Sequence, residues 1–230
     1  MIVKIIQLYK KIMCKKLNIC FLGDKCVGKT STIHTMVNSF FDEEKYSPTI
    51  ESKFNKLFSY KILYNLNIHD TAGSIEMESL LLDTIKQCDC FVIMYSITDR
   101  DSYDSIYKYR DLIKEAFPYK ENIPIILCAN KNDHKKQSQF SQNEIIDISK
   151  SFGLPSTISS AKCLNSVLNT FKLLLDIVQK YEKQVKKDKK KYEKNLKKTE
   201  KLELEKKKSI FEQVLLQIKY HKLILNKIIN

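Results

Sequence analysis

Glycine is scarce in this sequence. The chain of 230 residues has four glycines, four prolines and no tryptophan. Two of the glycines, Gly23 and Gly28, lie within the short stretch GDKCVGKT. Glycine lets the backbone adopt a positive φ angle and lets a ligand approach it closely. The sequence therefore predicts a ligand-binding loop at residues 23–30.

Long apolar runs are also lacking. No stretch reaches the roughly 18 uninterrupted apolar residues of a membrane-spanning helix. Residues 1–16 are apolar and basic, but lysines interrupt the apolar run and no small-residue cleavage site follows. We expect no signal peptide there. The segment is either a short amphipathic helix, lying on a membrane or on the domain, or a frayed tail.

Paired cysteine motifs are missing as well. The seven cysteines are an odd number, and none of them form a CxxC pair. Cys88 and Cys90 alternate within an apolar run, as residues of a strand do. This usage predicts a reduced, cytosolic protein with buried thiols, no disulfide framework and no cysteine metal site.

Charge is concentrated at one end of the chain. The formal net charge is +13, and from Tyr181 onward lysines exceed acidic residues by about nine. Residues 181–208 have almost no apolar stripe, which predicts a solvated helix or disorder. The extension 181–230 lacks a base-stacking array of aromatic residues, so we expect no nucleic-acid binding. Apolar residues then recur at helical spacing at Phe211, Val214, Leu215, Ile218, Leu225 and Ile228.

Between these ends, apolar runs and periodic segments alternate. The pattern predicts an α/β domain at residues 17–180, with a mostly parallel six-stranded sheet and helices on both faces. Apolar runs predict the strands, and 3.6-residue periodicity predicts the helices. The expected strands are 17–22, 52–60, 61–70, 88–97, 123–130 and 156–162, and the expected helices are 31–40, 102–117, 143–153 and 166–181.

The glycine-bearing stretch fits the pattern G-x-x-x-x-G-K-[ST] between a predicted strand and a predicted helix. Backbone N–H groups of such a loop bind phosphate oxygens, Lys29 reaches the β- and γ-phosphates, and the Thr30 hydroxyl binds Mg²⁺. The alternative is a glycine turn that matches by chance. The predicted phosphate-binding residues are Gly23, Asp24, Lys25, Cys26, Val27, Gly28, Lys29, Thr30 and Ser31.

Three further polar loops follow predicted strands. In DTAGS, Asp70 is placed to hold Mg²⁺ through water, and the Gly73 N–H to meet a γ-phosphate. In NKND, the Asp133 carboxylate matches the N1 and N2 donors of guanine, while Lys131 covers the purine. In SAK, the Ala161 N–H is placed to meet guanine O6. Each of these is an ordinary turn when taken alone, and the remaining candidates for base contact are Asn130, Ser160 and Lys162.

From about residue 17 to 180, the chain resembles the Ras-like small GTPases. The resemblance rests on five motifs in the expected order: GDKCVGKT, SPTIE, DTAG, NKND and SAK. The resemblance implies a three-layer P-loop NTPase fold that binds GTP or GDP with Mg²⁺. It also implies that Thr49 caps the metal, that Tyr46 closes over the phosphates, and that Phe41, or Phe40, packs against guanine. Residues 42–54 and 73–83 would be the two switches that meet effectors, exchange proteins and activating proteins.

Two departures from the family fall at the chemistry. Ser74 follows DTAG, where the family usually has a glutamine that orients the attacking water. Lys25 stands where Ras has glycine, beside the expected path of an activator's arginine finger. The resemblance names Lys29, Thr49, Gly73 and Ser74 as candidate catalytic residues. We therefore expect a switch enzyme with slow intrinsic hydrolysis, or alternatively a GTP-binding scaffold with little turnover.

The termini lack the family's lipid signals. The sequence ends LNKIIN without a CaaX box, and it does not begin with Met-Gly, so neither prenylation nor myristoylation is expected. We expect a cytoplasmic protein whose lysine-rich extension binds an anionic membrane surface or a protein partner, or extends into solvent. A P-loop kinase or ATPase is the remaining alternative, and NKND and SAK argue against it.

Overall fold

The structure, a computed structural model, describes residues 14–41, 51–73 and 78–229. The chain divides into two compact units, Met1–Tyr181 and Glu182–Asn230. The predicted residues Tyr46, Thr49 and Ser74 lie outside the described residues.

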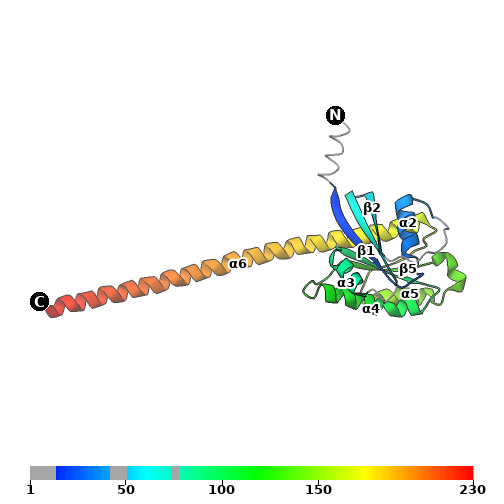
Figure 1. Ribbon diagram of the computed structural model, residues 1–230. Coiled ribbons are helices and arrows are strands. Elements are labelled where there is room, and N and C mark those ends of the chain that lie inside the picture. Colours follow the sequence, from blue (N-terminus) through cyan, green and yellow to red (C-terminus); the bar gives the residue numbers. More distant parts are fainter. Residues whose placement is uncertain (1–13, 42–50, 74–77, 230) are drawn as a thin grey trace, which may run out of the picture. The chain divides into compact units, whose positions relative to one another are not determined.

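The first unit is built on a six-stranded sheet with the order β2-β3-β1-β4-β5-β6. Strands β2 and β3 are antiparallel, and every other neighbouring pair is parallel. This confirms the predicted mostly parallel sheet (Figure 1). The strands are β1 (Lys15–Leu22), β2 (Glu51–Tyr60), β3 (Ile62–Thr71), β4 (Cys90–Ser96), β5 (Ile125–Asn130) and β6 (Ser156–Ile158).

Helices cover both faces of the sheet and enclose two hydrophobic cores. On one face, α2 (Lys29–Asn38) and the first part of α6 pack against β1, β3 and β4. On the other face lie α3 (Glu78–Lys86), α4 (Asp101–Ala116) and α5 (Gln142–Phe152). The central strands β4 and β5 are buried along their whole length, as their continuous apolar sequences predict.

Helix α5 shows how local sequence sets an element's ends. The Ser141 side chain accepts a hydrogen bond from the Glu144 N–H, and the Glu144 carboxylate accepts one from the Ser141 N–H. This reciprocal pair satisfies N–H groups that the first helical turn leaves unpaired. Gly153 ends the helix with φ 61°, the left-handed conformation that favours glycine at this position.

Three sequence predictions need correction. The last strand, predicted over 156–162, ends at Ile158, because the backbone then turns and the Ser160 N–H bonds to the Ser166 hydroxyl. Helix α3 was not among the predicted helices. The thiols are not all buried: Cys26 and Cys163 are exposed and Cys14 is partly exposed, while all seven cysteines are free.

The last helix is longer than predicted. Helix α6 spans Leu164–Ile229, so the lysine-rich extension is helical, one of the two states that its composition allowed. Residues 183–201 are exposed throughout, as expected for a helix without an apolar stripe. No helix in the described ranges is long and apolar enough to cross a membrane.

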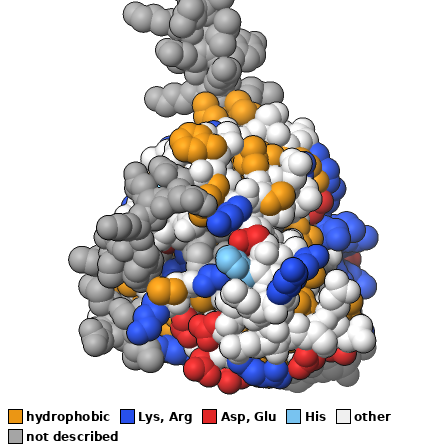
Figure 2. Space-filling model, turned by 90° about the vertical axis from the view of Figure 1, so that its right-hand side faces the viewer, with side chains coloured by type: hydrophobic (Ala, Val, Ile, Leu, Met, Phe, Trp, Pro, Cys, Tyr) orange, Lys and Arg blue, Asp and Glu red, His pale blue; other side chains and the backbone are white. Residues whose placement is uncertain are grey.

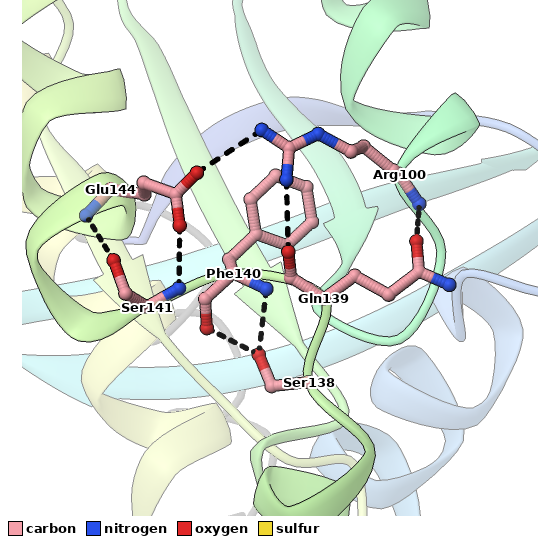
Figure 3. Close-up of polar contacts among 6 residues, drawn as sticks. All are labelled: Arg100, Ser138, Gln139, Phe140, Ser141 and Glu144. Atoms are coloured by element: carbon pink, nitrogen blue, oxygen red, sulfur yellow. Dashed lines mark hydrogen bonds and ion pairs between the residues drawn. The ribbon is translucent and has the colours of Figure 1, made fainter.

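One polar cluster ties the segment after β5 to the start of α4 (Figure 3). Arg100 donates from Nη1 to the Gln139 carbonyl at 2.9 Å and from Nη2 to Glu144 at 3.1 Å. Its guanidinium carbon also lies 4.9 Å from the centre of the Phe140 ring. The Arg100 N–H donates to the Gln139 side chain at 2.8 Å. Arg100 therefore holds residues 139–144 against the domain.

We predict that Arg100→Ala lowers the thermal midpoint of unfolding by about 2–4 °C, because the Gln139 carbonyl loses its donor and Phe140 loses its stacked cation. Circular dichroism at 222 nm measures the shift. Lys86→Ala is the control, since the ammonium of Lys86 lies 3.9 Å from Asp83 in an exposed pair worth little. Equal midpoints for the two variants would contradict the role of Arg100.

Candidate functional site

Four loops meet at one edge of the sheet. They follow the carboxyl ends of β1, β3, β5 and β6, and they contain residues 23–28, 72–73, 131–133 and 159–162. The carboxyl edge is where ligands of open α/β sheets bind. The fold therefore brings together the four motifs that the sequence singled out.

The loop at residues 23–28 contains three residues with positive φ: Gly23 at 142°, Cys26 at 61° and Gly28 at 97°. A Cβ atom on Gly23 would collide with the Met94 carbonyl oxygen, and one on Gly28 with the Asn130 side chain. The protein's own strands β4 and β5 therefore approach these glycines closely. Glycine is needed here for packing as well as for access by a ligand, which the sequence alone did not indicate.

Lys29, the first residue of α2, is buried with 6% of its surface exposed. Its ammonium donates to the carbonyls of Gly23 at 2.7 Å and Asp24 at 2.8 Å, so the loop curls around it. Burial lowers the pKa of Lys29 to about 8, although the carboxylates of Asp70 and Asp24 act in the opposite direction. A bound anion would favour the charged form of this lysine.

The Asp24 side chain points to helix α4. It accepts hydrogen bonds from Tyr109 Oη at 2.9 Å and from the Ser105 hydroxyl. Burial and the neighbouring Asp24 carboxylate raise the pKa of Tyr109, so the phenol remains a donor. Ser105 and Tyr109 thus anchor the loop, and sequence reasoning missed both. The one available signal was a serine and a tyrosine four residues apart, on one side of a helix.

Thr30 and Asp70 place two side-chain oxygen atoms next to each other. The Thr30 hydroxyl donates to Asp70 Oδ2 at 2.6 Å, and Asp70 is fully buried at the end of β3. Mg²⁺ typically takes one or two carboxylate ligands together with phosphate oxygens and water, so this donor set fits it. Within the described ranges, no group of three or more His, Cys, Asp or Glu residues could hold a metal.

Gly73 lies directly against the phosphate-binding loop. A Cβ atom there would overlap the Lys25 nitrogen and the Asp24 carbonyl carbon. Residue 73 therefore has no room for a side chain. The next residue, Ser74, stands where the family usually has glutamine, and it lies outside the described residues.

The loops after β5 and β6 are joined through Asp133. The Ser160 hydroxyl donates to Asp133 Oδ1 at 2.6 Å, and His134 Nε2 lies 3.1 Å from Oδ2. Asn130 donates to the Val27 carbonyl at 2.8 Å, which links this region to the phosphate-binding loop. Its Oδ1 is buried and accepts no hydrogen bond from the residues that the structure describes, so an acceptor remains open beside the site.

The SAK loop is held by a hydrogen bond from helix α2. Ala161 is buried, and its carbonyl accepts a hydrogen bond from Thr35 of α2 at 2.7 Å. The Lys162 ammonium lies 5.4 Å from the centre of the Phe41 ring, whereas Phe40 is 59% exposed. Of the two phenylalanines that the sequence left open, Phe41 is thus the one beside the SAK loop.

The remaining predicted residues are Val27, Ser31, Lys131, Lys25 and Cys26. Val27 is buried in the core between the sheet and α2. Ser31 lies in the first turn of α2, and Lys131 has φ 66° just before the 3-10 helix η2 (Asn132–Gln137). Lys25 and Cys26 are exposed at the tip of the phosphate-binding loop.

Charge on the described part of the surface in Figure 2 is mixed. Lysine and arginine side chains lie among aspartate and glutamate side chains. Nucleic-acid binders commonly carry a patch or stripe of positive charge. The described part of this face has no such uniform patch.

Comparison with known proteins matches this chain to one family. A family model described as Ras family matches residues 18–180. The Ras-like protein rasU of Dictyostelium discoideum is 38% identical over 149 residues, covering 64% of this chain and 68% of that protein. Its relative rasX is 32% identical over 173 residues, covering 74% and 80%. The mouse GTP-binding protein Rit1 is 28% identical over 180 residues, covering 75% and 78%.

The buried ammonium predicts a pH dependence. Because the pKa of Lys29 is lowered to about 8, and phosphates would raise it, GDP binding above pH 8 must take up a proton. We predict a constant dissociation constant below pH 8 and about a tenfold rise per pH unit above it. Titration calorimetry from pH 7 to 9 measures this. Lys29→Ala should bind more weakly without that rise, and it reports any titration of the nucleotide itself.

The anchor on α4 predicts a kinetic effect. We expect Tyr109→Phe to speed GDP release about three- to tenfold, because the Asp24 carboxylate loses a donor and the loop loosens. Release of a fluorescent GDP analogue measures the rate. The control is Tyr119→Phe, since Tyr119 is 97% exposed. Unchanged release from the Tyr109 variant would mean that Asp24 does not hold the loop.

Proposed function

Because this chain belongs to the Ras family of small GTPases, we propose that it is a switch that binds GTP and GDP with Mg²⁺ and hydrolyses GTP slowly. The observation that carries the proposal is the meeting of four motif loops at one edge of the sheet, around the buried Lys29. A chance glycine turn would not be accompanied by base-reading loops at the same edge.

The phosphate half of the site rests on Lys29 and the backbone of residues 23–28. The Lys29 ammonium now bonds to two carbonyls of its own loop, and phosphate oxygens are stronger partners for it. The N–H groups of the first turn of α2 supply further donors for an anion. These groups would hold the β- and γ-phosphates.

The base half rests on Asp133. Its carboxylate can accept two N–H bonds from guanine, and the Ser160 hydroxyl already orients one oxygen. Adenine lacks the corresponding pair of donors. Lys162 and Phe41 lie together beside the SAK loop, where they can cover the base. This arrangement supports guanine over adenine and argues against an ATP-dependent kinase.

The metal would be held by Thr30, and by Asp70 through water. When bound, Mg²⁺ neutralises charge on the phosphate oxygens. Thr49 completes this set in our proposal on the strength of the sequence alone. The Thr30–Asp70 hydrogen bond of 2.6 Å keeps the two protein oxygens side by side.

Slow hydrolysis follows from two residues. Ser74 is too short to orient a water molecule as glutamine does. Lys25 is exposed at the loop tip, where its side chain would hinder an activator's arginine finger. Ser74 also favours one alternative, a GTP-loaded scaffold that recruits partners constitutively.

We further propose that the protein is cytoplasmic and that α6 beyond Tyr181 contacts an anionic membrane surface or a partner protein. Lysines at an anionic surface contribute about 1 kcal/mol each. The exposed helix of residues 183–201 leaves its charges available for such a contact. Residues 42–54 and 73–83 would meet effectors and regulators.

The first test is the nucleotide that the purified protein carries, identified by ion-pair chromatography after denaturation. GDP would support binding with turnover, and GTP would support the scaffold. Competition between GDP and ADP for the site tests base selection. Equal affinity for the two would sink the guanine assignment.

The second test is single-turnover hydrolysis of GTP. We predict that Ser74→Gln raises the rate on the order of tenfold, because glutamine can orient the attacking water. Ser79→Gln is the matched control, since Ser79 is an exposed residue at the start of α3. A native rate as high as that of the Ser74→Gln variant would contradict slow hydrolysis.

A further inference from the structure

Ser166 lies in the first turn of α6, next to the SAK loop at residues 160–162, and it belongs to none of the motifs that the sequence singled out. Its backbone is fixed within the helix. The Ser166 N–H donates to the Cys163 carbonyl at 3.0 Å, and the Ser166 carbonyl accepts a hydrogen bond from the buried Thr170 hydroxyl at 3.0 Å. The backbone of Ser166 therefore has a fixed place beside the loop.

The Ser166 hydroxyl uses its full capacity for hydrogen bonds. It accepts from the Ser160 N–H at 3.0 Å and from the Ser159 hydroxyl at 3.2 Å. It can donate its single proton to the carbonyl of Cys163 at 2.8 Å or to that of Ser160 at 3.0 Å. A hydroxyl has one donor and two acceptor lone pairs, so all of them are used here. An alanine at this position would take an acceptor away from the Ser160 N–H.

Through this hydroxyl, Ser166 bonds to both backbone groups of Ser160, a buried residue. The Cys163 N–H donates to the same Ser160 carbonyl at 2.9 Å. The Ser160 side chain is fixed as well, because its hydroxyl donates to Asp133 Oδ1 at 2.6 Å and accepts from the Lys162 N–H at 3.2 Å. The first residue of the SAK loop is thus held at each of its polar groups.

The position of the Ser160 carbonyl sets the direction of the next N–H group. The peptide bond between Ser160 and Ala161 is trans, and a peptide group is planar, so the Ala161 N–H points away from the Ser160 carbonyl oxygen. The Ala161 carbonyl accepts a hydrogen bond from the Thr35 hydroxyl at 2.7 Å. A rotation of the peptide group between residues 160 and 161 would break the bonds to Ser166 and Cys163. The direction of the Ala161 N–H therefore depends on the Ser166 hydroxyl.

We propose that Ser166 is a positioning residue for guanine recognition, which acts by aiming the Ala161 N–H at the O6 atom of the base. The inference rests on the proposed function and adds a residue to it. Guanine O6 is a hydrogen-bond acceptor, whereas adenine carries a 6-amino donor at the same place. A well-aimed N–H group therefore favours guanine and opposes adenine, and Ser166 contributes to that choice through the peptide group that it holds.

The test compares the full chain carrying Ser166→Ala with the native chain on three diphosphates. GDP and inosine diphosphate both carry O6, while 2-aminopurine riboside 5′-diphosphate has hydrogen at that position. We expect Ser166→Ala to weaken the binding of GDP and of inosine diphosphate by the same factor, about three- to tenfold, because the hydrogen bond to O6 loses its alignment. Binding of the 2-aminopurine nucleotide should weaken by less than about twofold. Displacement of a fluorescent GDP analogue measures all three affinities.

Two further variants serve as controls. Ser151→Ala is the matched one, because the Ser151 hydroxyl in α5 donates to the Ile148 carbonyl three residues earlier at 2.9 Å, as that of Ser166 does to Cys163. It should leave all three affinities unchanged. Ser166→Thr keeps the hydroxyl and should retain the native affinity for GDP. A loss in Ser166→Thr as large as that in Ser166→Ala would contradict the role of the hydroxyl.

The outcomes separate this inference from the proposed function. An equal loss for all three nucleotides in Ser166→Ala would show that the substitution only loosens the site, and it would overturn the role of Ser166, as would unchanged binding of GDP. Both results leave the proposed function standing, since the native chain still binds GDP. A native chain that binds GDP no more tightly than ADP would overturn the proposed function, and the role of Ser166 with it.

Discussion

The phosphate-binding loop depends on close contact with the rest of its own domain. Gly23 lies against the Met94 carbonyl of β4, Gly28 against Asn130 of β5, and Gly73 against the backbone of Lys25. Asp24 is tied to α4 through Tyr109. These contacts hold an irregular backbone that few residues could adopt, and the proposed phosphate contacts follow from its position.

The architecture was largely predictable from the sequence, for a clear physical reason. Strands buried on both faces, such as β4 and β5, need continuous apolar runs, and these are visible without a structure. The capping box at Ser141 and the glycine at 153 similarly mark the ends of α5. Local chemistry and global fold agree at these points, which is typical of sequences that specify one structure.

What the sequence did not reveal depends on contacts between distant residues. Nothing in the local sequence of α4 indicates that Tyr109 bonds to Asp24, which lies 85 positions earlier. The extent of β6 was overestimated because Ser160 turns toward Ser166, an interaction that period-2 patterning does not encode. Tyr46, Thr49 and Ser74 remain predictions, because they lie outside the described residues.

The Arg100 cluster has a consequence for how this domain can vary. Both backbone groups of Gln139 are hydrogen-bonded. Its carbonyl accepts a hydrogen bond from the Arg100 side chain, and its N–H donates to the Ile97 carbonyl at 2.8 Å. At the other end of the same segment, the Asn132 N–H bonds to the Ser159 carbonyl at 3.0 Å. Exposed residues between these anchors, such as Lys135 and Lys136, can be exchanged without touching either one. The number of residues between them is less free, because both ends of the segment are bonded to fixed partners. The structure therefore restricts the length of this segment more than its composition.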